Sequence, residues 1–429
     1  MDDLVRWKNR NDRKPLILLG ARQVGKTYIL KEFGRREYDN VAYINCDNNA
    51  LVRDLFTPDY NIGRILLTIG AITGVNIQPG KTLIIMDEVQ ELKRGLASLK
   101  YFCEDAPQYH VAVAGSLLGL TLHDGDSYPV GKVNTLNMYP MTFEEFLLAR
   151  NRKQMVDLLQ AQRWDFVKGL RTLYIQHLRE YYLVGGMPEA VDKFVQTNDA
   201  NLVREVQNEI LAAYEKDISK HAPAEQVMRI GQVWHSIPSQ LAKENRKFIY
   251  GVVKKGARAK DYELAIQWLL DAGLVYKVNR VTTLAMPLKI HEEISAFKLF
   301  MLDCGLLGAM SLTPPAMLLL PSTDNSGKGD FTENFVCSQM KSLSDLPVFY
   351  YSKDNSQLEL DFVVQADTAV CPVEVKAEEN LQSKSLKTTL SENPDMHGLH
   401  FSMSDYREEG RLTNVPLYGA RSFLKALKQ

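Results

Sequence analysis

Short runs of consecutive apolar residues, each followed directly by glycine or by polar residues, dominate the first third of the chain. They occupy residues 16–19, 41–44, 83–86 and 111–114, within strands predicted at 16–19, 41–46, 82–87 and 111–116. Uninterrupted apolar runs of this length are typical of strands that are buried on both faces, as in a parallel sheet. Amphipathic helices are expected between them, for example over residues 61–75 and 96–104. The pattern therefore predicts an α/β fold with a parallel sheet for this part of the chain.

The pattern changes to helical spacing after about residue 150. Apolar residues recur at helical intervals over 166–182 and again over 202–218. Between these stretches Gly185 and Gly186 precede Pro188, a combination that interrupts helices. We therefore predict a helical segment with a hinge at the two glycines.

Three shorter helices and a hairpin are expected next. The helices are predicted near residues 230–241, 250–253 and 261–272, and the hairpin strands at 274–278 and 282–287. Three helices followed by a hairpin are the outline of a winged helix-turn-helix. Beyond them, a helix opening near 329–336 and alternating strands at 358–363 and 371–377 predict a second α/β region.

Length and composition are those of a water-soluble globular protein with several domains. The 429 residues are 45% hydrophobic and 24% charged, and the formal net charge is -1. We predict four parts, comprising residues 1–150, a helical linker or lid at 151–225, a winged helix at 226–290 and a final domain at 291–429. Five isolated cysteines without CxxC pairs argue against a disulfide framework, and no apolar signal core or membrane-spanning run is found. We expect a cytoplasmic protein without a membrane partner.

The turn after the first apolar run has the chemistry of a phosphate-binding loop. Gly20, four further residues and Gly25-Lys26-Thr27 match GxxxxGK[ST], between a predicted strand and a predicted helix. The glycines allow backbone N–H groups to point inward, and Lys26 is placed to reach the β and γ phosphates of a nucleotide. The residues expected to surround the nucleotide are Gly20, Ala21, Arg22, Gln23, Val24, Gly25, Lys26, Thr27 and Tyr28.

Two acids end the strand predicted at residues 82–87. Asp87 is expected to hold Mg²⁺ together with the Thr27 hydroxyl, and Glu88 to orient the attacking water. Ser116, at the end of the next strand, is a candidate to sense the γ phosphate, although a helix-capping serine is an equal alternative. Lys132 is a candidate second cation for the phosphates, or an ordinary solvated lysine. We therefore predict ATP and Mg²⁺ as cofactors, with Lys26, Asp87, Glu88 and Ser116 as the catalytic residues.

The motifs along the chain resemble a known family. The segments GARQVGKT, LIIMDEVQ, AVAGS, PVGK and YPMTFEEF, with YLVGGMPEA, FKLFMLDCGL, ELDF and VEVK further on, are similar to AAA-type ATPases that carry a C-terminal DUF4143 domain. The resemblance covers nearly the whole chain. It implies an ATP-binding core, a winged-helix segment and a nuclease-like fold.

Four residues of the last third resemble the core of a PD-(D/E)xK nuclease. Period-two alternation places Glu359 with Asp361 on one face of a strand and Glu374 with Lys376 on one face of the next. Together with Glu333 they would form a restriction-endonuclease-like site in which carboxylates hold Mg²⁺ and the lysine positions water. Leu360 stands where the motif has proline, and an ordinary half-exposed sheet is the alternative interpretation.

The leading hypothesis is an Mg²⁺-dependent ATPase whose nucleotide state controls a C-terminal module that engages DNA or protein. A group of basic residues before the last predicted helix of the winged-helix outline favours contact with DNA phosphates, with a solvated face as the alternative. They are Lys243, Arg246, Lys247, Lys254, Lys255, Arg258 and Lys260. The alternative functions are an ATP-regulated nuclease and a nucleotide-gated protein-interaction or defence switch. A homo-oligomer is a possible assembly, but only Arg22 and Arg94 are weak candidates for an arginine that completes a neighbouring site.

Overall fold

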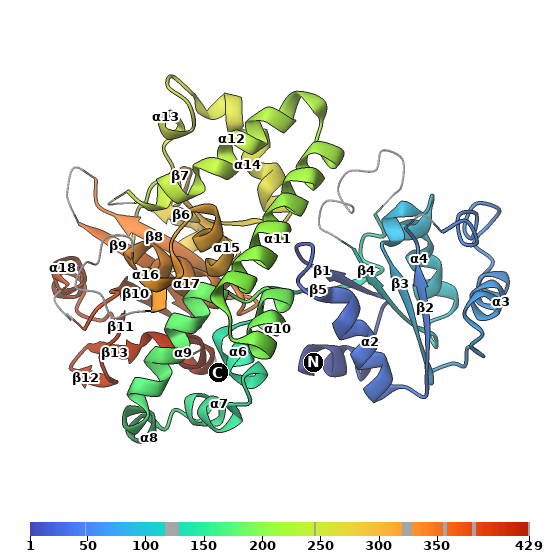
Figure 1. Cartoon of the computed structure of the whole chain (residues 1–429), viewed down its shortest axis with the longest axis horizontal. Coiled ribbons are helices and arrows are strands. Elements are labelled where there is room, and N and C mark those ends of the chain that lie inside the picture. Colours follow the sequence, from blue (N-terminus) through green and yellow to red (C-terminus); the bar gives the residue numbers. More distant parts are fainter. Residues whose placement is uncertain are drawn as a thin grey trace. The chain divides into compact units, whose positions relative to one another are not determined.

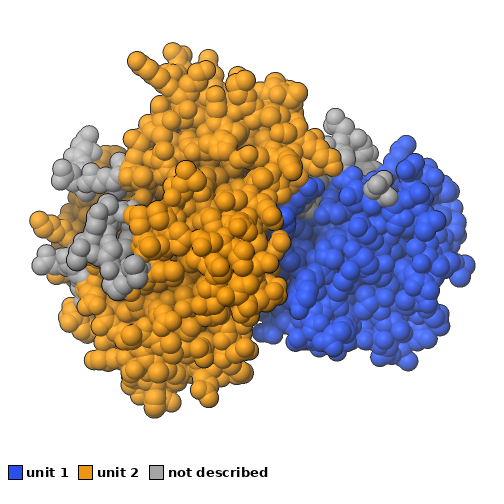
Figure 2. Space-filling model, in the orientation of Figure 1, with its two compact units in different colours: residues 1–139, 271–273 blue, residues 140–270, 274–429 orange. Residues whose placement is uncertain are grey.

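The computed structural model describes residues 1–47, 49–115, 128–243, 246–319, 328–354, 358–379 and 383–427. The chain divides into two compact units, coloured separately in Figure 2. Unit 1 comprises residues 1–139 with 271–273, and unit 2 comprises residues 140–270 with 274–429. Within the described residues, no helix combines the length and the apolar character needed to cross a membrane. All five cysteines are free thiols, as the sequence predicts.

Unit 1 is built on the expected five-stranded parallel sheet, in the order β2-β3-β4-β1-β5 (Figure 1). Its strands are β1 (Leu16–Leu19), β2 (Asn40–Asn45), β3 (Thr82–Asp87), β4 (His110–Ala114) and β5 (Asn134–Asn137). Its helices are α1 (Asp2–Lys8), α2 (Lys26–Glu37), α3 (Ile62–Thr73), η1 (Val89–Glu91) and α4 (Gly95–Asp105). Because β4 lies between β1 and β3, the loop that follows β1 and the loop that follows β3 flank the carboxyl end of β4.

Helices cover both faces of this sheet, which explains why its strands are apolar throughout. On one face Ile84 and Met86 of β3 share a core with Ile65 of α3 and Leu99 of α4. On the other face the alternate β3 residues, with Leu16 of β1, pack with residues of α1 and α2. The predicted helices and strands of this region are confirmed, within a few residues at their ends.

Unit 2 begins with helices, as the spacing of apolar residues predicts. The first is α6 (Phe143–Ala149), whose N-terminus is closed by a capping box between Thr142 and Glu145. It is followed by α7 (Lys153–Gln160), α8 (Trp164–Gly169), α9 (Arg171–Val184), α10 (Pro188–Thr197), α11 (Ala200–His221), α12 (Ala224–Leu241), α13 (Tyr250–Val253) and α14 (Ala259–Asp271). The remaining helices are η2 (Leu288–His291), α15 (Cys304–Met310), α16 (Pro315–Leu319), α17 (Lys328–Lys341), α18 (Lys384–Glu392), η3 (Leu417–Gly419) and α19 (Ala420–Leu427).

One mixed sheet runs through the rest of unit 2, in the order β12-β13-β11-β10-β9-β8-β6-β7. Its strands are β6 (Val275–Val281), β7 (Glu292–Met301), β8 (Val348–Ser352), β9 (Glu359–Ala366), β10 (Ala369–Val375), β11 (Gly398–Ser402), β12 (Arg407–Glu409) and β13 (Leu412–Pro416). The hairpin β6–β7 therefore belongs to the same sheet as the C-terminal strands, because β6 pairs with β8.

The second strand of that hairpin was predicted wrongly. The expected strand at 282–287 is an irregular connection, and the partner of β6 is β7, which starts at Glu292. The pairing partner was missed because a local apolar pattern does not say how long the connection between two strands is. The division of unit 2 into a linker, a winged helix and a nuclease-like domain stays a prediction.

The glycine pair between α9 and α10 is held tightly by neighbouring segments. The backbone N–H of Gly186 donates to the Asp303 carboxylate at 2.6 Å, and its carbonyl accepts from Met141 N at 2.7 Å. A side chain on Gly186 would collide with the Met141 backbone, and one on Gly185 would collide with Asp303. These glycines therefore allow three chain segments to approach closely, and the hinge stays a prediction.

Candidate functional site

The phosphate-binding loop has the backbone geometry that its sequence predicts. Gly20 leaves β1 in a conformation in which a side chain would strike the Met138 carbonyl, so only glycine fits there. Gly25 has φ +94° and forms the N-cap of α2, which starts at Lys26. The first turn of α2 and its positive dipole end thus follow directly from the loop, as phosphate binding requires.

Lys26 lies folded into this loop. Its side-chain nitrogen donates to the carbonyls of Gly20 at 2.9 Å and Ala21 at 2.8 Å, and only 7% of the residue is exposed. Burial lowers the pKa of Lys26 to about 8, although Glu88 and Asp87 oppose this shift. Since both acids influence Lys26 electrostatically, the glycine loop and the acidic strand end form one site.

Asp87 and Thr27 meet directly. The Thr27 hydroxyl donates to Asp87 Oδ2 at 2.7 Å, although 60 residues separate them in sequence. Tyr43 from β2 donates its hydroxyl to the same oxygen at 3.1 Å. A threonine hydroxyl beside a carboxylate is the pair of oxygens that a Mg²⁺-bound nucleotide uses in P-loop proteins, so these residues fit the ion. Tyr43 was not predicted, because nothing in the sequence of β2 marks it as a neighbour of Asp87.

Glu88 follows Asp87 in a left-handed backbone conformation, with φ +52°. Its backbone N–H donates to the Ala114 carbonyl at 2.9 Å, so Glu88 lies beside the end of β4. The Gln90 amide donates to the Glu88 carboxylate, a contact that the sequence analysis missed. Ser116, the predicted sensor that follows β4, lies outside the described residues.

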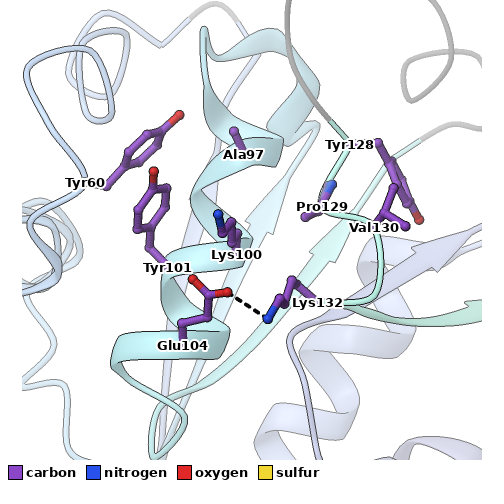
Figure 3. Close-up of a pocket in the computed structure, with 9 residues that line it drawn as sticks. All are labelled: Tyr60, Ala97, Lys100, Tyr101, Glu104, Tyr128, Pro129, Val130 and Lys132. Atoms are coloured by element: carbon purple, nitrogen blue, oxygen red, sulfur yellow. Dashed lines mark ion pairs between the residues drawn. The ribbon is translucent and has the colours of Figure 1, made fainter.

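Lys132 does not lie with the phosphate-binding residues. It precedes β5, at the end of the sheet where the parallel strands begin, whereas the glycine loop follows the end of the neighbouring β1. Its amine pairs with Glu104 Oε1 at 2.7 Å. The pair lines a pocket of about 410 Å³ between α4 and residues 128–132 (Figure 3). The prediction of Lys132 as a second phosphate cation is therefore wrong. Arg94 is engaged locally, since its guanidinium lies 4.1 Å from the Tyr60 ring centroid and donates to Thr57 O.

The four predicted C-terminal site residues come together in unit 2. Strand pairing of β9 and β10 reaches Phe362 opposite Val373, so Asp361 and Glu374 are the next residues on neighbouring strands. The Asp361 carboxylate accepts from Val375 N at 2.8 Å, and the Glu374 carboxylate pairs with Lys376 at 2.7 Å. Glu333 of α17 lies near enough to Asp361 for the Asp361 charge to act on the Glu333 carboxyl. We call Glu333, Asp361, Glu374 and Lys376 the acid cluster.

Burial dominates the electrostatics of the acid cluster. It raises the pKa of Glu333 to about 8 and that of Glu374 to about 7, and the Asp361 charge acts in the same direction on both. Oε2 of Glu333 and Oε2 of Glu374 are buried and have no hydrogen-bond partner among the described residues. Across the parts of the chain that the structure describes, no three His, Cys, Asp or Glu side chains are arranged to hold a metal ion. The cluster as it stands therefore does not fit the metal that a nuclease of this type requires.

Two of the seven basic residues predicted to contact phosphates pair with acidic residues of unit 2. Arg246 pairs with Glu333 at 2.7 Å and with Asp330 at 3.2 Å, and Lys247 lies 3.8 Å from Glu359. For Arg246, whose side chain is 15% exposed and held by two acids, the prediction of a phosphate contact is wrong, whereas for the more exposed Lys247 it stays a prediction. Four others lie exposed in or just before α14, at Lys254, Lys255, Arg258 and Lys260.

Comparison with known protein families gives three matches. Residues 12–147 match an AAA domain, residues 175–316 match a domain of unknown function (DUF8612), and residues 328–418 match another domain of unknown function (DUF4143). A search of curated proteins found no match.

Solved structures with similar chain traces include a Walker-type ATPase of Pyrococcus abyssi, at 15% identity and a TM-score of 0.45, covering 72% of this chain and 95% of that one. Cdc6p from Pyrobaculum aerophilum matches at 12% identity and a TM-score of 0.24, covering 74% and 90%. Protein VC1899 from Vibrio cholerae matches at 11% identity and a TM-score of 0.21, covering 97% of both chains.

The five-stranded parallel sheet, the glycine loop and the domain match define unit 1 as a P-loop ATPase domain of the AAA type. More particularly, the chain joins this AAA domain, at residues 12–147, to a C-terminal DUF4143 domain at residues 328–418. The resemblance drawn from the sequence motifs is thereby confirmed.

Proposed function

We propose that this protein binds Mg²⁺ and ATP in the glycine loop of unit 1 and hydrolyses the γ phosphate. The observation that carries the proposal is the 2.7 Å hydrogen bond between Thr27 and Asp87, next to the buried Lys26. Lys26 would bind the β and γ phosphates, Thr27 and Asp87 would hold Mg²⁺, and Glu88 would orient the attacking water. Mg²⁺ would neutralise the phosphate charge that develops during the reaction.

Replacement of Lys26 by Ala tests this proposal. We expect the variant to lose ATP binding, measured by calorimetry, and phosphate release, measured by a coupled assay, because the loop loses its phosphate cation. Arg35→Ala is a control on the same helix, since Arg35 is an exposed cation that pairs with Glu32 and not with the loop. Unchanged ATP binding and turnover in Lys26→Ala would show that the site is not an ATPase centre.

We further propose that the nucleotide state changes how unit 2 engages a polyanionic partner, with DNA as the first candidate. The exposed Lys254, Lys255, Arg258 and Lys260 support this, because they group four positive charges within seven residues on a chain of net charge -1. Phosphate contacts of this kind make binding steeply dependent on salt. Turnover of ATP with and without duplex and single-stranded DNA tests the proposal. A rate that neither DNA changes would favour the alternative of a nucleotide-gated protein-interaction or defence switch.

A second candidate function is nucleic-acid cleavage at the acid cluster, in a PD-(D/E)xK nuclease domain that ATP regulates. It is favoured by the convergence of Glu333, Asp361, Glu374 and Lys376 from one helix and two strands. Incubation of plasmid with the protein and Mn²⁺, beside Asp361→Ala and Lys376→Ala, tests cleavage. Equal cleavage by wild type and both variants would remove this candidate.

A further inference from the structure

Positive side chains of the chain itself pair with two glutamates of the acid cluster and with the nearby Glu359. Lys376 pairs with Glu374 at 2.7 Å, and Lys298 of β7 pairs with Glu359 of β9 at 2.9 Å. Arg246 pairs with Glu333 at 2.7 Å. Each of these three glutamates therefore has an internal positive partner, and this agrees with the lack of a three-ligand metal group among the described residues.

Arg246 comes from a different part of the chain than the acids it contacts. It lies between α12 and α13, 84 residues before Asp330 and 87 before Glu333. The neighbouring Phe248 anchors this segment, because its N–H donates to Phe297 O at 2.8 Å and its ring stacks on the Phe297 ring at 5.2 Å. Arg246 is thus carried into the acid cluster by a connection between helices.

The internal cations differ in how easily they can leave. Lys298 is fully buried and lies within β7, so its withdrawal would require the strand to separate from the sheet. Arg246 lies outside any helix or strand, and 15% of its side chain is exposed. Its φ is +52°, a left-handed conformation that costs a residue other than glycine about 1 kcal/mol. Withdrawal of Arg246 would therefore disrupt the fold less than withdrawal of Lys298.

Two buried carboxylate oxygens show where a further positive ligand would bind. Oε2 of Glu333 and Oε2 of Glu374 lack hydrogen-bond partners in the described residues, and both glutamates are at most 7% exposed. A guanidinium already lies on the other oxygen of Glu333. Its positive charge, held within the cluster, opposes the approach of a divalent cation.

We propose that Arg246 is an internal plug that keeps the acid cluster closed to a divalent metal ion, and that withdrawal of its guanidinium from Glu333 and Asp330 opens the cluster to that ion. This deepens the second candidate function and rests on it, because it makes metal binding conditional on movement of the Arg246 side chain. The test measures metal binding rather than DNA cleavage. A cluster that binds metal but does not cleave DNA would contradict the nuclease function and leave the plug supported, whereas unchanged metal binding would contradict the plug itself.

The experiment titrates Mn²⁺ into nucleotide-free, full-length protein and follows free Mn²⁺ by electron paramagnetic resonance. We expect Arg246→Gln to bind one further Mn²⁺ per chain in the acid cluster. Its dissociation constant there should be lower than that of wild type by about ten-fold or more, because a repelling charge is removed. Arg246→Lys keeps the positive charge and serves as the matched control, with wild-type binding. Addition of Asp361→Asn to Arg246→Gln should abolish the gained binding, which places it in the acid cluster.

Two outcomes would overturn the proposal. In one, folded Arg246→Gln shows no gain in Mn²⁺ binding. In the other, wild type already binds Mn²⁺ equally tightly at a site that Asp361→Asn removes. Circular dichroism establishes whether Arg246→Gln folds. If it does not fold, Arg246→Met decides, since methionine keeps an unbranched side chain of similar length but carries no charge. Tighter Mn²⁺ binding than wild type then supports the plug, and unchanged binding contradicts it.

Discussion

The carboxylate of Asp303 and the backbone N–H of Gly186 form a 2.6 Å hydrogen bond inside unit 2, across 117 residues of sequence. Asp303 also caps α15, because it accepts from Leu306 N at 2.9 Å. Only 2% of Asp303 is exposed. One buried side chain thus connects the α9–α10 loop to the start of α15, and its removal should lower the stability of unit 2.

Asp303→Ala should lower the free energy of unfolding of unit 2 by about 3 kcal/mol, because two buried N–H groups lose their acceptor. Chemical denaturation of the full-length protein measures the loss. Asp199→Ala is the matched control, since Asp199 caps α11 in the same way but is exposed. Removal of such a cap costs about 1 kcal/mol. Equal losses in the two variants would contradict the tie between Asp303 and Gly186.

Asp303 should also make unit 2 less stable as the pH rises. Burial raises the pKa of its carboxyl from 3.8 to about 6, against the opposing effect of the backbone N–H groups. The unfolded chain therefore releases this proton at lower pH than the folded chain. The stabilisation is complete below about pH 4 and is lost as the pH rises to about 6, a change of about 3 kcal/mol.

Asp303→Asn tests this dependence, because asparagine keeps an oxygen acceptor but does not titrate. The difference in unfolding free energy between wild type and variant should change between pH 4 and pH 6 and stay constant above that range. Burial raises the pKa values of the neighbouring Tyr181, Tyr214 and Cys304, so these groups stay neutral throughout. A difference that does not vary with pH would show that Asp303 keeps an ordinary pKa.

Gly186→Ala should destabilise unit 2 severely, by about 3 kcal/mol or more, since the new methyl group would meet the Met141 backbone. Thermal unfolding and soluble yield measure the effect. Gly169→Ala is the control, because a side chain at Gly169 has no atom within 4 Å. If alanine at position 186 were tolerated like alanine at 169, the glycine pair would have the freedom of a hinge.

Glu88→Gln should separate nucleotide binding from hydrolysis. The amide keeps the size of the side chain but cannot accept the proton of the attacking water, so turnover should fall about 100-fold or more. ATP affinity should change little, because Lys26, Thr27 and Asp87 are retained. Calorimetry and phosphate release measure the two quantities. Full turnover in Glu88→Gln would assign the water-orienting role to another residue.

Tyr43→Phe should weaken Mg²⁺-dependent ATP binding by about five-fold, the effect of losing one hydrogen bond to the Asp87 carboxylate. The ring remains and keeps its contact with Lys31, so the stability of unit 1 should not change. Comparison of ATP affinity with and without Mg²⁺ isolates the effect on the metal. A loss of affinity that is the same without Mg²⁺ would place Tyr43 outside the metal site.

Local patterns were sufficient to predict the elements of unit 1 and to indicate which residues meet in its candidate nucleotide site. Lys26, Thr27, Asp87 and Glu88 follow from a glycine loop and an acid-ended strand, because in a parallel sheet such loops meet at one edge. The acid cluster was also predicted from alternation on two neighbouring strands. Lys132 was placed wrongly, because the sequence around it does not show that it precedes β5, at the end of the sheet away from the glycine loop.

The sequence by itself determined the helices and strands of unit 1 and the long helices at the start of unit 2, because their apolar periodicity is a local property of the chain. It also determined the phosphate loop, whose chemistry lies within eight consecutive residues. Only the tertiary structure decided that Tyr43 reaches Asp87, that Gly186 binds Asp303 and that Arg246 lies among buried acids. These contacts join residues 44, 117 and 87 positions apart, and depend on how the folded elements pack. No short-range pattern contains that information, since buried partners find each other through packing in three dimensions.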